Sequence, residues 1–293
     1  MEYMDFLNAV RDYINETAQD VSVSIHTAQK NNGVMLSGLT FSQKGYNASP
    51  TIYMDNYYTE YIAGRDINEI GDGLLSLYYE NDLATNYDIS FFDDFGYIKD
   101  RLFIKLINRK KNEDFLKQAP HEDFLDLSIV AYVRIYDKKM GNGLIMVRNE
   151  HLDIWDEDAE TVINIAKKNT HDREEYNITH IVDVLGRLGG GIMIPECERS
   201  QIPMYVATNR RMTYGAAVMT MSDKLKEFGS VIGSDYVIIP SSVNELILVP
   251  NGNDDFGDID SMIREVNETQ LGPDDILADH AYMYSIKDEV LIF

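Results

Sequence analysis

The sequence predicts an α+β fold built of antiparallel β-hairpins with packed helices. Residues 124–136 and 143–149 are rich in β-branched and aromatic residues and flank the Gly-containing segment 137–142, a pattern typical of a long hairpin. Between such hairpins, apolar residues recur at the spacing of one helix face. This alternation of hairpins and helices favours an antiparallel architecture over a doubly wound parallel sheet.

The first 80 residues are expected to form a helix, a small β-meander and a second helix. The first helix is expected over 3–18, where apolar residues form one stripe. The second is expected over 66–80, because Asp66 followed by Glu69 is a plausible helix cap. The strands of the meander are expected at 21–28, 34–42 and 51–54, separated by turn-forming residues.

A third helix is expected over 91–106, where apolar residues again repeat at helical spacing. Its stripe consists of Phe91, Phe95, Ile98, Leu102 and Leu106. Acidic residues at 93–94 near its start and basic residues at 109–111 near its end suit the helix dipole. The basic stretch is therefore interpreted as a solvated helix end.

One shift in composition divides the chain. Residues 186–203 contain four glycines, two prolines and the only cysteine, which is typical of a connector. We therefore expect an N-terminal α+β domain at 1–187, a connector at 188–202 and a C-terminal α+β domain at 203–293, or one continuous domain. Helices are expected from 156 onward and over 178–188. The C-terminal domain is expected to be a β-β-α-β-β-α module, with strands at 204–208, 214–220, 235–240 and 245–250, helices at 222–232 and 258–270, and final strands near 281–285 and 289–293.

The chain of 293 residues carries 49 acidic and 26 basic side chains, a formal net charge of -23. This charge favours solubility and repels nucleic acid and anionic membranes. The single Cys197 has no second thiol with which to form an internal disulfide, as is usual in a reducing compartment. The sequence begins without a signal-peptide pattern and has no apolar run of membrane length. We expect a cytoplasmic protein with no membrane partner and no direct nucleic-acid binding.

Four side chains around the long hairpin suggest a metal site. His121 and Asp123 lie at the mouth of its first strand, and His151 and Asp153 follow its second strand. Imidazoles and carboxylates bind zinc, manganese or iron, and a carboxylate can act as general base on a metal-bound water. No HExxH or HxH spacing fixes two ligands on one face, and His151 suits a helix cap or a packing position equally well. The hypothesis is a divalent metal at these four residues; otherwise no cofactor is expected.

A second polar feature is the turn that carries Arg210 and Arg211 between two expected strands. Arginine side chains form paired hydrogen bonds to phosphate or carboxylate, so this turn is a candidate anion site; a solvated hairpin tip is the alternative. Other motif matches fail. Residues 186–191 lack the lysine and hydroxyl of a Walker loop, and residues 251–262 lack the central glycine and final glutamate of an EF-hand.

Several ordered phrases of the sequence resemble one family. They are VSVSIHTAQKNNGVMLSGLTF, SPTIYMDNYY, PHEDFLDLSIVAYV, NEHLDIW, PMYVATNRRMTYGAAVM and DYVIIPSSVNELILVP. Together they resemble an uncharacterised family of unknown function from anaerobic Gram-positive gut bacteria, whose genes often lie near mobile elements. The resemblance covers nearly the whole chain. It implies a bacterial cytoplasmic protein and implies no activity, cofactor or site residue.

Three functions are considered from these features. The first is a binding or regulatory protein without catalysis that acts on a protein partner, with tyrosines such as Tyr57, Tyr58 and Tyr61 available for an interface. The second is a metal-dependent hydrolase that uses the cluster around His121 and His151. The third is an acidic mimic of nucleic acid, which the net charge of -23 would allow if it gathers on one face.

Overall fold

The computed structural model describes residues 1–81, 83, 86, 88–137, 141–188, 203–250 and 256–293. By the contacts between residues the chain divides into two compact units. The first unit comprises residues 1–30 and 34–90, and the second comprises residues 31–33 and 91–293. All strand pairs among the described residues are antiparallel, so the predicted α+β class is confirmed.

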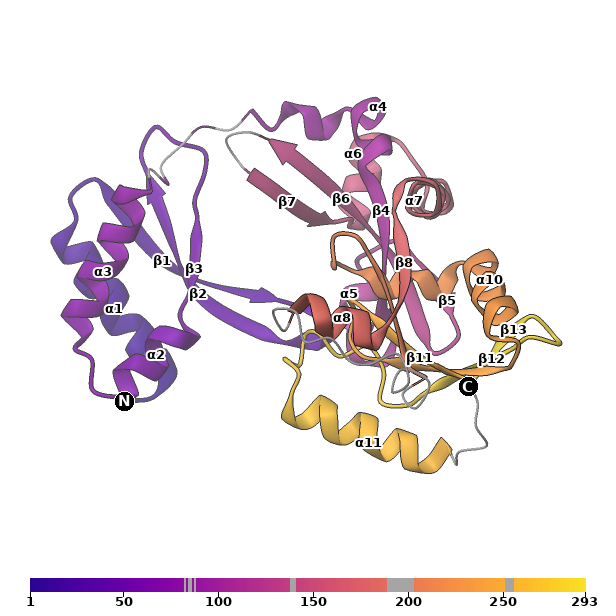
Figure 1. The fold of residues 1–293 in the computed structure, drawn as a ribbon. Coiled ribbons are helices and arrows are strands. Elements are labelled where there is room, and N and C mark those ends of the chain that lie inside the picture. The colour runs from indigo at the N-terminus through magenta and orange to yellow at the C-terminus, as the bar shows by residue number, and fades with distance from the viewer. Residues whose placement is uncertain (82, 84–85, 87, 138–140, 189–202, 251–255) are drawn as a thin grey trace. The chain divides into compact units, whose positions relative to one another are not determined.

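The first unit packs helices against a three-stranded sheet of order β1-β2-β3 (Figure 1). Its strands are β1 (Val21–Gln29), β2 (Met35–Gln43) and β3 (Thr51–Tyr53), and its helices are α1 (Tyr3–Thr17), α2 (Asp55–Ile62) and α3 (Ile67–Glu80). The meander and the two longer helices were predicted. The capping role of Asp66 is confirmed, because its carboxylate accepts a hydrogen bond from the backbone N–H of Asn68 at 2.8 Å. Helix α2 was not predicted.

The core of the first unit explains where its tyrosines lie. The α1 residues Phe6, Leu7, Val10 and Ile14 are fully buried in one cluster with residues of β2 and α3. The ring of Tyr58 lies 5.0 Å from that of Tyr3, and the ring of Tyr61 stacks on Phe6 at 5.2 Å. The tyrosines of α2 thus pack partly against α1.

The second unit contains a four-stranded sheet in which β6 is central. Strands β4 and β5 pair with β6 on its two sides, and β7 also pairs with β6. The strands are β4 (Leu102–Asn108), β5 (His121–Phe124), β6 (Leu127–Asp137) and β7 (Gly141–Met146). The helices and turns that accompany them are η2 (Ser90–Asp93), α4 (Phe95–Ile98), η3 (Lys99–Arg101), η4 (Lys110–Asn112), α5 (Glu113–Leu116), α6 (Asn149–Trp155) and α7 (Ala159–Arg173).

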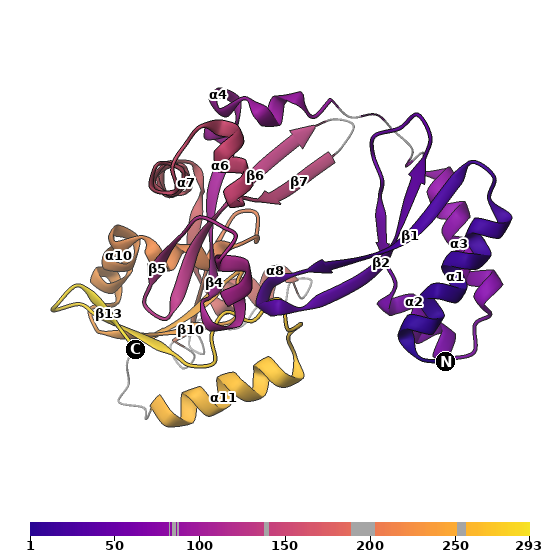
Figure 2. The same ribbon diagram turned by 180° about the vertical axis from the view of Figure 1, so that it is seen from behind.

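The second unit also contains a six-stranded sheet of order β13-β12-β10-β11-β9-β8. Its strands are β8 (Tyr176–His180), β9 (Tyr205–Asn209), β10 (Tyr236–Pro240), β11 (Leu246–Pro250), β12 (Tyr282–Ser285) and β13 (Val290–Ile292). Helix α11 (Phe256–Thr269) covers one face (Figures 1 and 2). There Ile263 packs with Val237 and Ile239. The other face, with Tyr236 and Ile238, joins the main core together with α10 (Ser222–Ile232).

A short turn from early in the sequence completes the second unit. This turn is η1 (Asn31–Gly33), in which Asn32 has a left-handed φ of 60°. The side-chain amide of Asn32 donates to the carbonyls of Pro273 and Ile276 at 2.8 and 2.7 Å. Its backbone N–H donates to the side-chain oxygen of Asn112 at 2.8 Å. Amide groups therefore connect η1, η4 and the segment before β12.

The helix expected over 91–106 is wrong. Short helical turns occupy the segment as far as Arg101, and β4 follows. Every residue of β4 is buried, so both faces of the strand carry apolar side chains and the alternation that marks a half-exposed strand is missing. For this reason Leu102 and Leu106 of β4 also matched the spacing of one helix face. The basic residues 109–111 follow a strand and enter η4 instead of closing a helix.

The C-terminal module also differs from the prediction. Residues 214–220 were expected to form a strand, but Gly215–Thr220 form a buried 3-10 helix, η5. The observed order is β9, η5, α10, β10, β11, α11, β12, β13, so the β-β-α-β-β-α description is wrong at its second element. Small residues permit this, since Gly215 leaves no room for a Cβ atom and Ala216 and Ala217 are fully buried. The segment 178–188 is the end of β8 followed by α8 (Ile181–Leu188).

The predicted connector at 188–202 lies almost entirely outside the described residues. Strands β8 and β9 on its two sides pair antiparallel, with Ile178 opposite Ala207. Cys197 and most of the acidic loop 251–258 also lie outside the described residues. Among the helices that the structure describes, none has the length and apolar character needed to span a bilayer.

Candidate functional site

One face of the four-stranded sheet carries charged and polar side chains into the interior. Directly paired residues of antiparallel strands lie on the same face, and alternate residues along a strand share it. The pairs Phe103 with Tyr132, Lys105 with Val130 and Ile107 with Ser128 therefore lie on one face, and Arg134 extends it. The opposite face, with Ile104, Leu106, Ile129 and Ala131, belongs to the main apolar core.

Lys105 is the most unusual residue of this polar face. It is only 6% exposed, and its amine has no hydrogen-bond or ion-pair partner among the described residues. The amine lies 4.3 Å from the centre of the Tyr214 ring, a cation–π contact. Burial lowers the pKa of Lys105 to about 8, although the carboxylates of Asp274 and Asp275 act in the opposite direction. The described residues thus enclose a cation without supplying a direct counter-ion.

A second unsatisfied group lies on the neighbouring strand. The hydroxyl of Ser128 is buried and has no hydrogen-bond partner among the described residues. Ser128 pairs with Ile107, two residues along β4 from Lys105, so the two side chains are diagonal neighbours on one face. Buried polar groups are normally hydrogen-bonded, and each exception requires an explanation.

The same face contains a buried ion pair. The side chains of Arg134 and Glu174 are 7% and 4% exposed, and their Nη1 and Oε1 atoms are 2.5 Å apart. Arg134 also donates to the hydroxyl of Tyr132 at 2.9 Å, and its guanidinium lies 3.9 Å from the centre of the Phe103 ring. Burial raises the pKa of Tyr132 to about 12, so this phenol stays neutral. Arg134 therefore has both a counter-ion and a hydrogen-bond acceptor, whereas Lys105 has neither among the described residues.

A strained loop places Tyr214 over Lys105. Met212 and Tyr214 both adopt left-handed φ angles, 52° and 55°, which cost free energy for residues other than glycine. The side-chain oxygen of the buried Asn209 accepts hydrogen bonds from the backbone N–H groups of Arg211 and Thr213 at 3.1 and 3.2 Å. These bonds fix the course of the loop.

The end of the loop is fixed equally closely. The side-chain oxygen of Asn244 accepts from the backbone N–H of Tyr214 at 2.9 Å. At Gly215 a Cβ atom would lie 2.3 Å from the hydroxyl of Thr208 and 2.5 Å from the carbonyl of Asn244, so only glycine fits. The Tyr214 ring consequently meets Lys105 with its face and lies 5.0 Å from the ring of Tyr132 at 76°. We call Lys105, Ser128, Tyr132, Arg134 and Tyr214 the Lys105 cluster.

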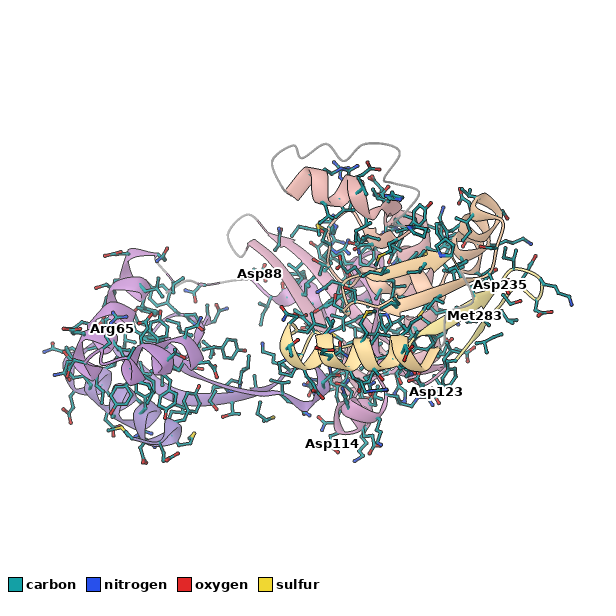
Figure 3. The ribbon with its side chains drawn as sticks, turned by 60° about the horizontal axis from the view of Figure 1, so that its bottom comes forward. Arg65, Asp88, Asp114, Asp123, Asp235 and Met283 are labelled. Atoms are coloured by element: carbon teal, nitrogen blue, oxygen red, sulfur yellow. The ribbon has the colours of Figure 1, made fainter. Side chains whose placement is uncertain are left out.

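The first two predicted metal ligands lie on β5 at the surface. The ring of His121 places Nδ1 2.9 Å from the carbonyl of Ala119. Asp123 forms an ion pair with Arg109 at 3.2 Å and lies at the outside of the second unit (Figure 3). His121 pairs with Val130, which places it on the same sheet face as Lys105, one strand further away.

The other two predicted ligands lie on α6 and serve other contacts. His151 Nδ1 accepts the backbone N–H of Arg148 at 3.1 Å, and the imidazole packs against Phe92 and Trp155. Burial lowers the pKa of His151, so its ring is neutral near pH 7. Asp153 is exposed. In the part of the chain that the structure describes, no three His, Cys, Asp or Glu side chains gather as ligands for a metal ion.

The two predicted anion-binding arginines lie on the strained loop but do not converge. Arg210 forms an exposed ion pair with Glu175 at 3.3 Å. The guanidinium of Arg211 lies 5.1 Å from the centre of the Tyr136 ring. The turn that carries them leads directly to Tyr214, so the predicted segment adjoins the Lys105 cluster through a residue that sequence reasoning did not select.

Sequence reasoning missed Lys105 and Arg134. Each is a lone cation in a run of apolar residues, FIKLI and VAYVRIY, which is the available signal. In a strand with one solvated face, such a residue would point to water. Here both faces of β4 are buried, so the cation is enclosed.

Comparison with known proteins supports the predicted resemblance at the level of the family. The model of a family of unknown function, DUF5688, matches residues 3–286. No curated protein and no solved structure matches the chain.

Proposed function

Because this chain belongs to DUF5688, a family of unknown function, we propose a function from its own residues: the second unit binds a small anion at Lys105. The protein acts in this proposal as a binding or regulatory protein, in which an anionic ligand completes the Lys105 cluster. The observation that carries the proposal is the enclosed amine of Lys105, which lacks a hydrogen-bond or ion-pair partner among the described residues.

Energetics support a ligand at this position. A buried charge is costly unless it is paired and hydrogen-bonded, so an anion that reaches Lys105 gains a desolvated counter-ion. The hydroxyl of Ser128, buried and without a partner among the described residues, supplies a second donor on the same sheet face. The ring of Tyr214 lies over the amine and itself contacts the ring of Tyr132, and this aromatic cover limits competition from water.

The net charge of -23 does not prevent an anion from binding at Lys105. Salt screens exposed charges over about 10 Å at 0.1 M ionic strength, whereas the buried amine acts at contact distance in a medium of low polarity. The acidic surface therefore slows the approach of anions, and the local cation determines whether one stays bound.

The proposal is preferred to metal-dependent hydrolysis because of the contacts of the predicted ligands. Asp123 is paired with Arg109, and Nδ1 of His151 accepts a backbone hydrogen bond. Among the described residues no three His, Cys, Asp or Glu side chains gather as ligands, so the predicted residues do not converge as a metal-bound water would require. A protein partner is a further part of the proposal and depends on the tyrosines named above; the bacterial cytoplasmic setting near mobile elements is another and depends on the sequence resemblance.

Thermal denaturation with added inorganic phosphate, sulfate or acetate tests the proposal. We expect at least one of these anions to raise the midpoint of the wild-type chain as its concentration rises. Lys105→Met should abolish the shift, and Lys105→Arg should retain part of it because the charge remains. Lys110→Met, which removes an exposed cation from η4, is the matched control and should respond like wild type. Equal shifts in Lys105→Met and wild type would refute the proposal.

A further inference from the structure

The geometry points to Lys105 as a nucleophilic amine that forms an imine with a carbonyl-bearing organic anion, such as a 2-oxo acid. This inference rests on the proposed function and names the ligand class of that same site. Three observations support it: the described residues place no carboxylate in contact with Lys105, the Tyr214 ring lies over its amine, and the side chain is enclosed.

The absence of a carboxylate contact is the first support. A lysine attacks a carbonyl only as the neutral amine, and a carboxylate in contact with the ammonium holds the proton in place. Lys167 shows the usual arrangement, with its amine 2.8 and 3.0 Å from the two carboxylate oxygens of Glu122. Lys105 has no such contact among the described residues. With its pKa lowered to about 8, roughly a tenth of the Lys105 amine is neutral at pH 7.

The Tyr214 ring is the second support. An imine of lysine becomes a cationic iminium when protonated, with its charge close to the position of the former ammonium. The face of Tyr214, 4.3 Å from the amine, attracts a cation at that position without accepting its proton. The left-handed backbone angles of Met212 and Tyr214 lower the folding stability, and in return they hold this ring in place.

Enclosure is the third support. Lys105 is 6% exposed, and Val130 beside it is fully buried. Exclusion of water favours the dehydrated imine over its hydrolysis. The carboxylate of the same ligand would interact with the cationic site, which explains why an anion and a carbonyl belong together in one ligand.

The step balances without an oxidant or reductant. The lone pair of Nζ adds to the carbonyl carbon, and the C–O π electrons move to oxygen, which takes up a proton. The nitrogen loses one proton to give the carbinolamine, and the hydroxyl group leaves as water after protonation while the C=N bond of the iminium forms. Loss of the second nitrogen proton gives the imine. One amine and one carbonyl give one imine and one water.

Reductive trapping on the chain of 293 residues tests the inference. The protein is incubated with pyruvate or glyoxylate and sodium cyanoborohydride at pH 8, and the labelled lysine is located by peptide mass spectrometry. We expect at least about tenfold more adduct at Lys105 than at Lys110, because a lysine of ordinary pKa is almost wholly protonated at pH 8. Equal labelling of the two lysines would overturn the inference.

Two variants separate this inference from the proposed function. Lys105→Arg keeps the charge but cannot form an imine, so it should retain part of the thermal shift with acetate and lose the site-specific adduct. A wild-type chain that shows the acetate shift but no adduct at Lys105 contradicts the imine and leaves anion binding intact. A chain that shows neither contradicts both.

A pH profile keeps the test independent of variant folding. The rate of adduct formation at Lys105 in the wild-type chain should level off above about pH 8, where the amine is largely neutral. Adducts at exposed lysines should continue to increase toward pH 10. A Lys105 profile that rises in parallel with those of exposed lysines would contradict the inference.

Discussion

The carboxylate of Asp126 accepts hydrogen bonds from both His280 and Tyr282, at 2.9 Å from Nε2 and 2.7 Å from the phenol oxygen. Nδ1 of His280 lies 2.9 Å from the carbonyl of Ala281, so both ring nitrogens face acceptors and the imidazole is protonated in this arrangement. The hydrogen bond to Asp126 raises the pKa of His280. Burial acts against ionisation of Asp126, yet the bonds from His280 and Tyr282 lower its pKa overall.

These shifts predict a pH window for stability. The contribution of His280 is complete below about pH 6.5, its unfolded value, and is lost as pH rises through the higher folded pKa. The contribution of Asp126 is present above about pH 3.9 and is lost as pH falls through the lower folded pKa. A double-mutant cycle of Asp126→Asn and His280→Gln by urea unfolding should give a coupling of about 1 kcal/mol at pH 5 and much less at pH 8.5. The same coupling at both pH values would contradict this assignment.

The buried ion pair predicts a large difference between two adjacent glutamates. Glu174→Gln leaves the enclosed charge of Arg134 without a counter-ion and should lower the free energy of unfolding by about 3 kcal/mol. Glu175→Gln removes only the exposed pair with Arg210 and should cost less than about 1 kcal/mol. Chemical denaturation of the two variants at pH 7 measures both values; similar losses would show that burial of the Arg134 pair is not decisive.

Replacing Lys105 should stabilise the ligand-free chain. The folded state disfavours the lysine charge, a cost that is complete below about pH 8 and disappears as pH rises toward the unfolded pKa near 10.4. After allowance for the lost contact with Tyr214, Lys105→Met should raise the free energy of unfolding by about 2 kcal/mol at pH 7. The gain should shrink between pH 8 and pH 10. Urea unfolding in a buffer without organic anions measures it, and a loss of stability at pH 7 would count against an uncompensated charge.

The loop that holds Tyr214 predicts a strong effect at Gly215. An added Cβ would lie 2.3 Å from the Thr208 hydroxyl, so Gly215→Ala should cost about 2–4 kcal/mol and disturb the ring above Lys105. Gly143→Ala in β7 is the control, because its Cβ would only touch Ile135 at an ordinary 3.8 Å. Thermal unfolding and near-UV circular dichroism compare them. Equal effects of the two substitutions would contradict the packing argument.

Much of the fold could be predicted because most elements bury a single face. Helix α1 and the β1–β2 meander show the expected periodicity, and the long hairpin of β6 and β7 was recognised from its turn. Strand β4 was missed because burial on both sides removes its alternation. Residues 214–220 were misassigned because the left-handed Tyr214 and the small residues after it respond to long-range packing that local pattern does not record.

The candidate site was less predictable than the fold. Histidines and carboxylates near strand ends drew attention to His121 and His151, whose contacts prove to be local. Lys105 is distinctive because no described residue supplies a direct counter-ion, a property that depends on which strands pair and which loop covers them. Only the register of β4 with β6 and the course of the loop after β9 reveal that property.

The turn η1 makes the second unit discontinuous in sequence. A fragment that begins at residue 91 would lack Asn32, and the carbonyls of Pro273 and Ile276 would lose their amide donor. During synthesis, residues 31–33 leave the ribosome long before residues 273–276, so this part of the second unit closes only after residue 276 has been made. Dividing the protein for separate expression at the boundary near residue 90 would therefore remove a structural component of the larger unit.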